Sequence, residues 1–423
     1  MNFIEVKKAV PRTEIEIENV QNAVRDIIAR VKKEGDEAIR YFEKKFDNYD
    51  PPTFRVSAEE AVKAKDKLPP EIVEELDFAI DQVTLFAKAQ KACFSNLDTE
   101  IKPGMKMGHR VIPVDSCGCY IPAGRYPCLT AAVMSIVPAK VAGVKRIVAC
   151  SPPGQIGEIN PGILYTIHEL GCEEIYCMGG AHAIAALAYG TETIAPVDLI
   201  VGPGNQYVAE AKRQVFGRVG IDFIAGPSEV LIIADETGSA EILAADLLAQ
   251  AEHDPNARTC LVTTSRELAE KALEEIERQL KKRTTEEVAR TSWENNGMVI
   301  VTENLEDAVA FSNEYAPEHL EIHTENPDAI LQQCRHYGSA FKGEISAEVY
   351  ADKVAGPNHT LPTLGSAKFT GGLWVGMYMK VMTHMEITSK EAALKLAKHS
   401  ENQAKYEGMD AHRYAATIRL KNM

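Results

Sequence analysis

The feature that most constrains the fold is an alternation of short apolar runs and helical stretches, which extends from about residue 110 to residue 323. The runs are rich in β-branched residues, as is typical of strands buried on both faces of a sheet. Strands that alternate with helices at this spacing require right-handed crossovers, which place helices on both faces of a parallel sheet. The sequence therefore predicts an α/β fold.

The alternation divides into two series, and we expect two doubly wound modules joined near residues 226–230. The first series predicts strands at 146–150, 174–178, 198–202 and 222–226, with a helix over 205–216. The second predicts strands at 230–235, 260–264, 297–301 and 319–323, with helices from Ser239, over 266–281 and from 305. Helical periodicity also covers 14–46 and 58–92, and the polar pattern after about 375 predicts helix.

The charge balance and the composition narrow the class of protein. The chain of 423 residues has 46 basic and 61 acidic side chains, and a net charge of −15 disfavours binding to nucleic acid or to an anionic membrane surface. No signal peptide and no apolar run of roughly 18 residues is present, so we expect a cytoplasmic protein. The nine cysteines include no C-x-x-C pair and predict reduced, buried thiols.

Two strand-to-helix turns are candidates for a nucleotide phosphate site. Gly179-Gly180 and the segment 202–205 contain small residues that would let the backbone approach an anion at a helix N-terminus. Tight packing between strand and helix explains the same glycines, and both interpretations stay open. The G-x-G-x-x-G turn is absent, which weakens a simple Rossmann interpretation.

Four short segments carry residues suited to metal binding or acid–base chemistry. Gln250 and His253 lie three apart and share a helix face, so they could converge on one ion, although a histidine near a helix end is often a dipole partner. Glu318 and His319 form an adjacent acid and base, which we expect at the carboxyl-end rim of the sheet unless they lie in a solvated loop. Asp352 precedes a turn-forming loop that contains His359.

The tail adds Glu407 and His412, which are five residues apart and do not face each other closely on an ideal helix. Alone, a tail histidine carries little weight. Combined with three of the residues above, His412 completes a mixed nitrogen and oxygen set that suits Zn²⁺ with room for a substrate. The set is Gln250, His253, Asp352 and His412.

Several longer strings together resemble the histidinol dehydrogenase family over nearly the whole chain: GPGNQYVAEAKRQVFGRVGID, AGPSEV, ADLLAQAEHD, YAPEHLE and AGPNHTLPT. The resemblance implies a homodimer of two incomplete Rossmann-like modules, with the tail of one subunit completing the active site of the other. It implies the following division: a helical N-terminal arm over 1–20, a discontinuous first module over 21–119 and 228–372, a second module over 120–227, and a small helical tail domain over 373–423 that packs on the partner subunit.

The resemblance also implies roles for individual residues. Glu318 and His319 would be the catalytic acid/base pair, and Tyr120 and Asn205 would contact NAD. The zinc ligands would be Gln250, His253, Asp352 and His412, and the substrate pocket would contain these four with Ser228, His319, His359 and Glu407. The implied reaction carries a primary alcohol through its aldehyde to a carboxylate with two molecules of NAD.

The chain departs from the histidinol enzymes in the loop after Tyr120, at His182 where they usually have a cofactor-contacting Gln, and in the Trp-containing stretch 370–384. These features resemble the paralogous sulfopropanediol 3-dehydrogenases, which oxidise 2,3-dihydroxypropane-1-sulfonate to sulfolactate. Arg125 is then an expected sulfonate anchor, or else a surface charge. We expect the sulfonate diol as substrate, with L-histidinol as the alternative. A non-catalytic paralogue is disfavoured because both Glu318 and His319 are present.

Overall fold

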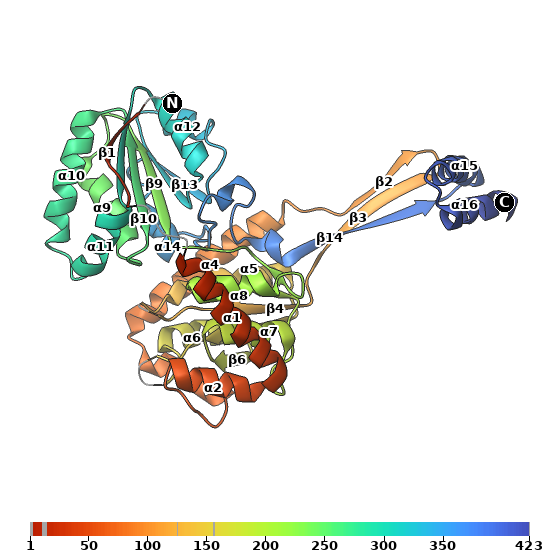
Figure 1. The fold of residues 1–423 in the computed structure, drawn as a ribbon, viewed down its shortest axis with the longest axis horizontal. Helices are drawn as coiled ribbons and strands as arrows, with labels where there is room; N and C mark the ends of the chain where they lie inside the picture. Colours follow the sequence, from red (N-terminus) through yellow and green to blue (C-terminus); the bar gives the residue numbers. More distant parts are fainter. Residues whose placement is uncertain (1–2, 11–14, 125, 155–156, 423) are drawn as a thin grey trace. The chain divides into compact units, whose positions relative to one another are not determined.

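The computed structural model describes residues 3–10, 15–124, 126–154 and 157–422, and Figure 1 shows their mixed α/β fold. The chain forms two compact units. The first consists of Met1–Lys88 and Val114–Tyr378, and the second of Ala89–Pro113 and Met379–Met423. No helix in the described ranges is both long and apolar enough to cross a membrane.

One sheet of the first unit has five parallel strands in the order β6-β5-β4-β7-β8. The strands are β4 (Ser116–Tyr120), β5 (Arg146–Ser151), β6 (Glu174–Cys177), β7 (Leu199–Val201) and β8 (Gly220–Ile221). The helices that follow them are α5 (Leu129–Ala142), α6 (Pro161–Glu169), α7 (Gly180–Tyr189) and α8 (Gln206–Val215). The predicted strands near 146, 174 and 198 are confirmed, whereas β4 was not predicted.

The strand predicted at 222–226 is wrong, because β8 ends at Ile221. The side chain of Asp222 contacts the turn between β7 and α8. Its Oδ2 accepts a hydrogen bond from the Gly202 N–H at 2.9 Å, and its Oδ1 pairs with Lys212. With Asp222 engaged in these contacts, the pairing of β8 with β7 stops at Ile221, directly before the predicted segment 222–226.

The other sheet of the first unit has six strands in the order β1-β11-β10-β9-β12-β13. All four strands predicted for the second series are confirmed as β9 (Glu229–Ala234), β10 (Arg258–Thr263), β11 (Met298–Thr302) and β12 (His319–His323), and β13 (Ser339–Lys342) extends the parallel set. The helices are α9 (Ala240–Ala251), α10 (Arg266–Leu280), α11 (Glu286–Asn296), α12 (Leu305–Tyr315), α13 (Pro327–Leu331) and α14 (Glu348–Lys353). Figure 1 shows α9, α10 and α11 on one face of this sheet and α12 on the other.

The N-terminal segment differs from the expected helical arm. It begins with a strand, β1 (Phe3–Lys7), which pairs antiparallel with β11. Helices α1 (Ile15–Glu34) and α2 (Asp36–Phe46) follow and are separated at Gly35, whose φ is 54°. The next helical region is α3 (Ala58–Lys63), a 3-10 turn η1 (Lys65–Lys67) and α4 (Pro70–Lys91), which begins at a proline.

Helices α1 and α2 pack with the five-stranded sheet and not with residues 228–372, as the expected division had placed them. Val24 and Ile39 share a buried core with Ile184 of α7 and Val208 of α8. Helical periodicity reveals that one face is buried, but it does not identify the partner of that face.

The second unit combines two segments that are distant in sequence. Its antiparallel sheet has the order β14-β3-β2, with β2 (Leu97–Lys102), β3 (Met105–Pro113) and β14 (Met379–Ile387), and it also contains α15 (Lys390–Tyr406) and α16 (Asp410–Asn422). Two 3-10 turns of the first unit, η2 (Ser366–Lys368) and η3 (Val375–Tyr378), precede β14. The tail therefore begins with a strand where helix was expected, because pairing with β3 along its whole length satisfies its backbone groups.

Candidate active site

Glu318 and His319 lie at the amino end of the parallel strands. His319 is the first residue of β12 and is in register with Val230 of β9 and Ser339 of β13, each near the start of its strand. The prediction that the pair lies at the carboxyl-end rim was wrong. A dipeptide that follows a helix and precedes a strand is at the amino end of that strand, so the order of the elements in the sequence already indicated this position.

The backbone of Glu229 fixes both side chains of the pair. The N–H of Glu229 donates a hydrogen bond to Glu318 Oε2 at 2.7 Å, and the Glu229 carbonyl oxygen lies 2.9 Å from His319 Nδ1. Because a carbonyl oxygen only accepts hydrogen bonds, Nδ1 carries a proton. Burial lowers the pKa of His319 to about 4, so the ring is neutral near pH 7 and Nε2 has a free lone pair.

His319 Nε2 accepts no hydrogen bond from any residue that the structure describes. It lies 3.4 Å from Oε1 of Glu348, which α14 brings to the site. Burial, followed by repulsion from Asp352, raises the pKa of Glu348 to about 8. Burial also raises the pKa of Glu318 well above its ordinary value. The site therefore combines a neutral imidazole base with two buried carboxyl groups that hold protons strongly.

Three of the four expected metal ligands lie in the first unit. Gln250 is buried on α9, and its Oε1 meets no hydrogen-bond donor within the described ranges. His253 follows the end of the same helix, and Asp352 lies on α14. Desolvation opposes ionisation of Asp352, but the charges of His359, Lys353 and His253 outweigh it and hold its pKa well below the usual range.

Asp352, His253 and His359 lie close enough to His319 to influence its pKa. His359 Nδ1 lies 3.9 Å from Asp352 Oδ1. An amide oxygen, an imidazole and an ionised carboxylate form a donor set that suits Zn²⁺, and the unpartnered Gln250 oxygen is the clearest sign that a further group belongs here. The donor set fits the metal that the sequence predicts.

Sequence reasoning missed Thr130, which connects this region to the five-stranded sheet. Its hydroxyl, in the first turn of α5, donates to the backbone oxygen of Asp352 at 3.0 Å and lies 3.2 Å from His359 Nε2. The neighbouring Asn358 donates to the Met134 carbonyl oxygen of the same helix at 2.8 Å. The loop that contains His359 is thus held by α5.

Glu229 and Glu348 were also missed. A signal existed for each: Glu229 is a charged residue at the head of a fully apolar strand, and Glu348 lies four residues before Asp352, on the same helix face. Ser228, which was predicted to line the substrate pocket, is half-buried directly before β9.

The residues expected to contact the cofactor lie where strands of the five-stranded sheet end. Tyr120 ends β4, and its buried hydroxyl accepts a hydrogen bond from the Gly180 N–H at 3.2 Å. Asn205 follows β7 and caps α8 by accepting from the Tyr207 and Val208 N–H groups. The chain leaves β4 on one side and β7 on the other, so these two positions flank the point where the strand order reverses, a common place for a bound nucleotide.

His182 is not open to a ligand in this structure. Its side chain is 1% exposed, and Nε2 lies 2.7 Å from Oε1 of the fully buried Glu43. The same carboxylate oxygen accepts a hydrogen bond from the Gly179 N–H at 2.8 Å. Glu43 therefore links His182 to the backbone of the turn at Gly179-Gly180.

The other three residues predicted for the site are not among the described residues of the first unit. Glu407 and His412 are exposed residues of the second unit, at the end of α15 and on α16. Arg125 lies outside the described residues. The roles predicted for these three residues stay predictions.

Comparisons with known proteins identify the family of the chain. A family model described as histidinol dehydrogenase matches residues 10–420. The chain is 47% identical to a histidinol dehydrogenase of Bacillus licheniformis over 402 residues, which cover 95% of this chain and 94% of that protein. It is 41% identical to a sulfopropanediol 3-dehydrogenase of Ruegeria pomeroyi over 417 residues, or 98% and 95% of the two chains. The crystal structure of histidinol dehydrogenase from Elizabethkingia anophelis superposes with a TM-score of 0.90 at 35% identity and covers 98% of this chain and 97% of that one.

Proposed function

The chain belongs to the histidinol dehydrogenase family, and on that basis we propose that it oxidises L-histidinol to L-histidine in two NAD-linked steps. It is an NAD-dependent oxidoreductase that acts on an alcohol. The single observation that carries the proposal is the neutral His319, whose Nε2 is unprotonated and unpartnered in the described part of the site.

The proposed reaction consumes one water and two NAD⁺ for each alcohol and releases a carboxylate, two NADH and three protons. In each oxidation the substrate loses a proton from oxygen and a hydride from carbon. NAD⁺, when bound, accepts that hydride. The protein has to remove protons from two different groups, first the alcohol and then the water that adds to the aldehyde.

His319 is the base for the alcohol. Its Nδ1–H is held by the Glu229 carbonyl oxygen, so Nε2 keeps one orientation and is ready to accept the hydroxyl proton. Glu318 is the base for water in the second step. Its raised pKa makes the carboxylate a stronger base than an exposed glutamate, and the Glu229 N–H holds one of its oxygens in place.

We infer that Gln250, His253 and Asp352 hold a zinc ion together with His412 of the partner subunit. Such an ion supplies Lewis acidity and fixes the substrate oxygen. His412 belongs to the second unit and is exposed, as expected of a residue that serves a partner. A homodimer with shared sites follows from this assignment. In the pocket, Ser228, His359 and Glu407 complete the surroundings of the substrate.

For NAD, we infer that the five-stranded sheet acts as an incomplete Rossmann-like module, with the cofactor between the ends of β4 and β7. Tyr120 and Asn205 flank that position. His182 is engaged by Glu43, so its proposed role is to shape the glycine turn and not to contact the cofactor directly. The six-stranded sheet would be the second incomplete module and carries the catalytic pair.

L-histidinol takes the place of the sulfonate diol as the favoured substrate. The carboxylate of Asp352, whose pKa is held well below its usual range and whose charge acts on His319, suits a substrate that carries an ammonium group better than one that carries a sulfonate. The Ruegeria relative keeps 2,3-dihydroxypropane-1-sulfonate as the second candidate.

Cations near the described site are already engaged. Lys353 pairs with Asp352, and Arg258 Nη1 lies 3.5 Å from Glu229 Oε1. A sulfonate would have to compete with these carboxylates for a positive partner.

A side-by-side assay tests the choice of substrate. Purified enzyme loaded with Zn²⁺ receives NAD⁺ and either L-histidinol or 2,3-dihydroxypropane-1-sulfonate, and NADH is followed by absorbance. We expect kcat/KM for L-histidinol to exceed that for the sulfonate by at least about 100-fold, which corresponds to about 2.7 kcal/mol. A reversed ratio would assign the chain to the sulfonate reaction, and turnover of neither alcohol would reject both.

A further inference from the structure

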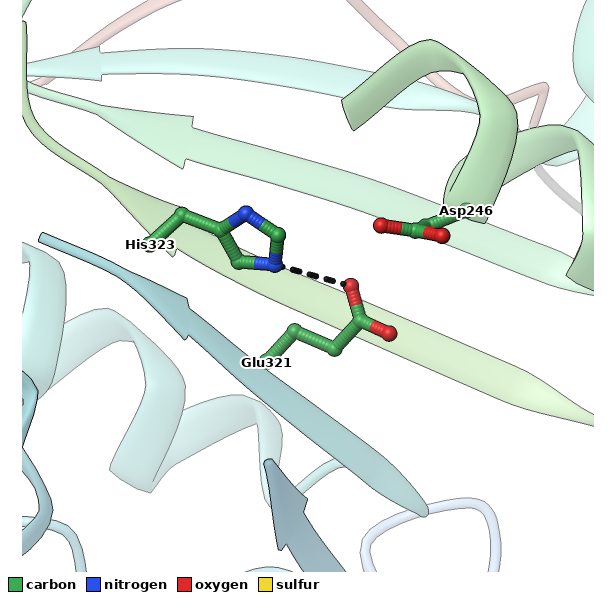
Figure 2. Close-up of side chains that lie close together, drawn as sticks. All are labelled: Asp246, Glu321 and His323. Atoms are coloured by element: carbon green, nitrogen blue, oxygen red, sulfur yellow. Dashed lines mark ion pairs between the residues drawn. The ribbon is translucent and has the colours of Figure 1, made fainter. Parts of the chain in front are cut away.

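Strand β12 carries polar side chains at every second position, namely His319, Glu321 and His323. Alternate residues of a strand point to the same face of the sheet, so these three share one face, while Leu320 and Ile322 enter the core on the other. The polar face looks toward α9, which presents Asp246 to it (Figure 2). A line of polar groups therefore continues from the catalytic histidine into the interior.

Three of these groups form a compact cluster, Asp246, Glu321 and His323. One ligand atom from each lies within 4.8 Å of the other two. Glu321 is fully buried and His323 is 3% exposed. Figure 2 shows the Glu321 carboxylate beside the imidazole, with His323 Nε2 at 3.3 Å from Glu321 Oε2, and the Asp246 carboxylate facing both.

The cluster is incompletely satisfied by the protein. Asp246 Oδ2 and His323 Nδ1 make no hydrogen bond with any residue in the described ranges, and Glu321 Oε2 lies 3.3 Å from His323 Nε2. The other carboxylate oxygen, Glu321 Oε1, accepts a hydrogen bond from the Glu348 N–H at 3.0 Å. Burial and the nearby Glu321 raise the pKa of Asp246 to about 7. Two buried carboxyl groups beside one imidazole need either a proton or a cation to offset their desolvation.

We propose that Asp246, Glu321 and His323 bind a second divalent cation, Zn²⁺ or Mn²⁺, at a site separate from the catalytic residues. Two carboxylate oxygens and one imidazole nitrogen are ligands that both ions accept, and the buried Glu321 Oε2 and His323 Nε2 face each other with the Asp246 carboxylate beside them (Figure 2). The cation links α9 to β12 and fixes the strand that begins at His319. Through the Glu348 N–H on Glu321, it also anchors the start of α14.

Metal counting tests the proposal without using activity. The full-length protein is stripped with a chelator and reloaded with Zn²⁺ alone or Mn²⁺ alone, and bound metal is measured by mass spectrometry after gel filtration. We expect His323→Gln and Glu321→Gln to bind one equivalent per chain less than the wild type. Glu321→Gln keeps a carbonyl oxygen to accept the Glu348 N–H, so it preserves that contact. The exposed Glu325→Gln removes a nearby charge and should leave the count unchanged.

His253→Ala is the second reference, because it should remove only metal bound near the catalytic pair. Equal counts for wild type and His323→Gln, in proteins with matching circular dichroism, would overturn the proposal and leave a proton as the neutralising charge. If both cluster variants fail to fold, anomalous scattering from wild-type crystals soaked in Zn²⁺ decides. A peak between Asp246 and His323 supports the site, and its absence in those crystals rejects it.

Discussion

His319 Nδ1 lies 2.9 Å from the backbone oxygen of Glu229, and this contact determines which nitrogen of the ring can act as a base. The carbonyl oxygen requires a proton on Nδ1, and burial keeps the ring neutral, so the lone pair is on Nε2. The backbone N–H of the same Glu229 holds Glu318. One peptide group therefore orients both members of the catalytic pair.

The two members are expected to differ in the step they serve. His319→Asn should slow oxidation of the alcohol by about 10²–10⁴-fold, because it removes the proton acceptor from the first step. Glu318→Gln should slow conversion of the aldehyde to the acid more than it slows aldehyde formation. The two half-reactions are measured separately, starting from the alcohol and from the aldehyde. Equal losses in both half-reactions for both variants would refute the division of roles.

The tautomer and pKa of His319 can be observed in the metal-free protein. With ¹⁵N-labelled histidine, its ring signals should show protonated Nδ1 and no change between pH 8 and pH 6, where an exposed imidazole takes up a proton. The pKa is depressed below the unfolded value of about 6.5, so the neutral ring favours folding above that pH, and this contribution is lost as pH falls toward 4. His319→Asn identifies the signal. Protonation at pH 6 to 7 would contradict the assignment.

Metal removal should abolish turnover, and Zn²⁺ should restore it. Gln250 Oε1 has no partner in the described chain, and His253 and Asp352 provide further donors, so Gln250→Ala should lower zinc content as well as activity. The exposed Gln333→Ala is a suitable control for loss of an amide. Full turnover by protein shown to contain no metal would end the zinc assignment.

Subunit exchange tests whether His412 serves a partner. His412→Ala and His253→Ala should each be inactive, because each lacks one proposed ligand. In a mixed dimer one site collects both changes while the other keeps every ligand, so activity should return to at most about half of the wild-type value per dimer. Verified exchange without any recovery would place His412 in the site of its own subunit.

The alternation of strands and helices could be predicted from the sequence, because buried parallel strands such as β9 contain continuous apolar runs. The packing partners of amphipathic helices could not be predicted, because the apolar periodicity of α1 shows that one face is buried but does not identify the sheet it packs against. The β14 strand was missed although Met379, Val381, Met385 and Ile387 alternate with mostly polar residues, because its side chains are mostly exposed and the polar pattern that follows in the tail is helical.

The acid–base pair Glu318 and His319 and the candidate metal ligands Gln250 and His253 could be proposed from the sequence because chemically suited residues lie at short spacing. The residues that orient these groups could not be predicted from the sequence. Glu229 marks itself as a charged residue at the head of an apolar strand, but its contacts with the pair are made by its backbone, and Thr130 acts from helix α5 of the other sheet's module, a role that leaves no sequence pattern. The alternation His319, Glu321, His323 did leave one, since three polar residues at every second position of a buried strand are unusual, and it was interpreted only as a strand.

The most direct test of the proposed function is the yield of NADH from a limiting amount of L-histidinol. The zinc-loaded enzyme is given excess NAD⁺, the reaction runs to completion, and NADH and L-histidine are quantified together by absorbance and mass spectrometry. A four-electron oxidation by His319 and Glu318 in one site predicts two NADH and one L-histidine per alcohol, with no aldehyde accumulating. One NADH per alcohol with free aldehyde as the product, or no consumption of L-histidinol, would contradict the account.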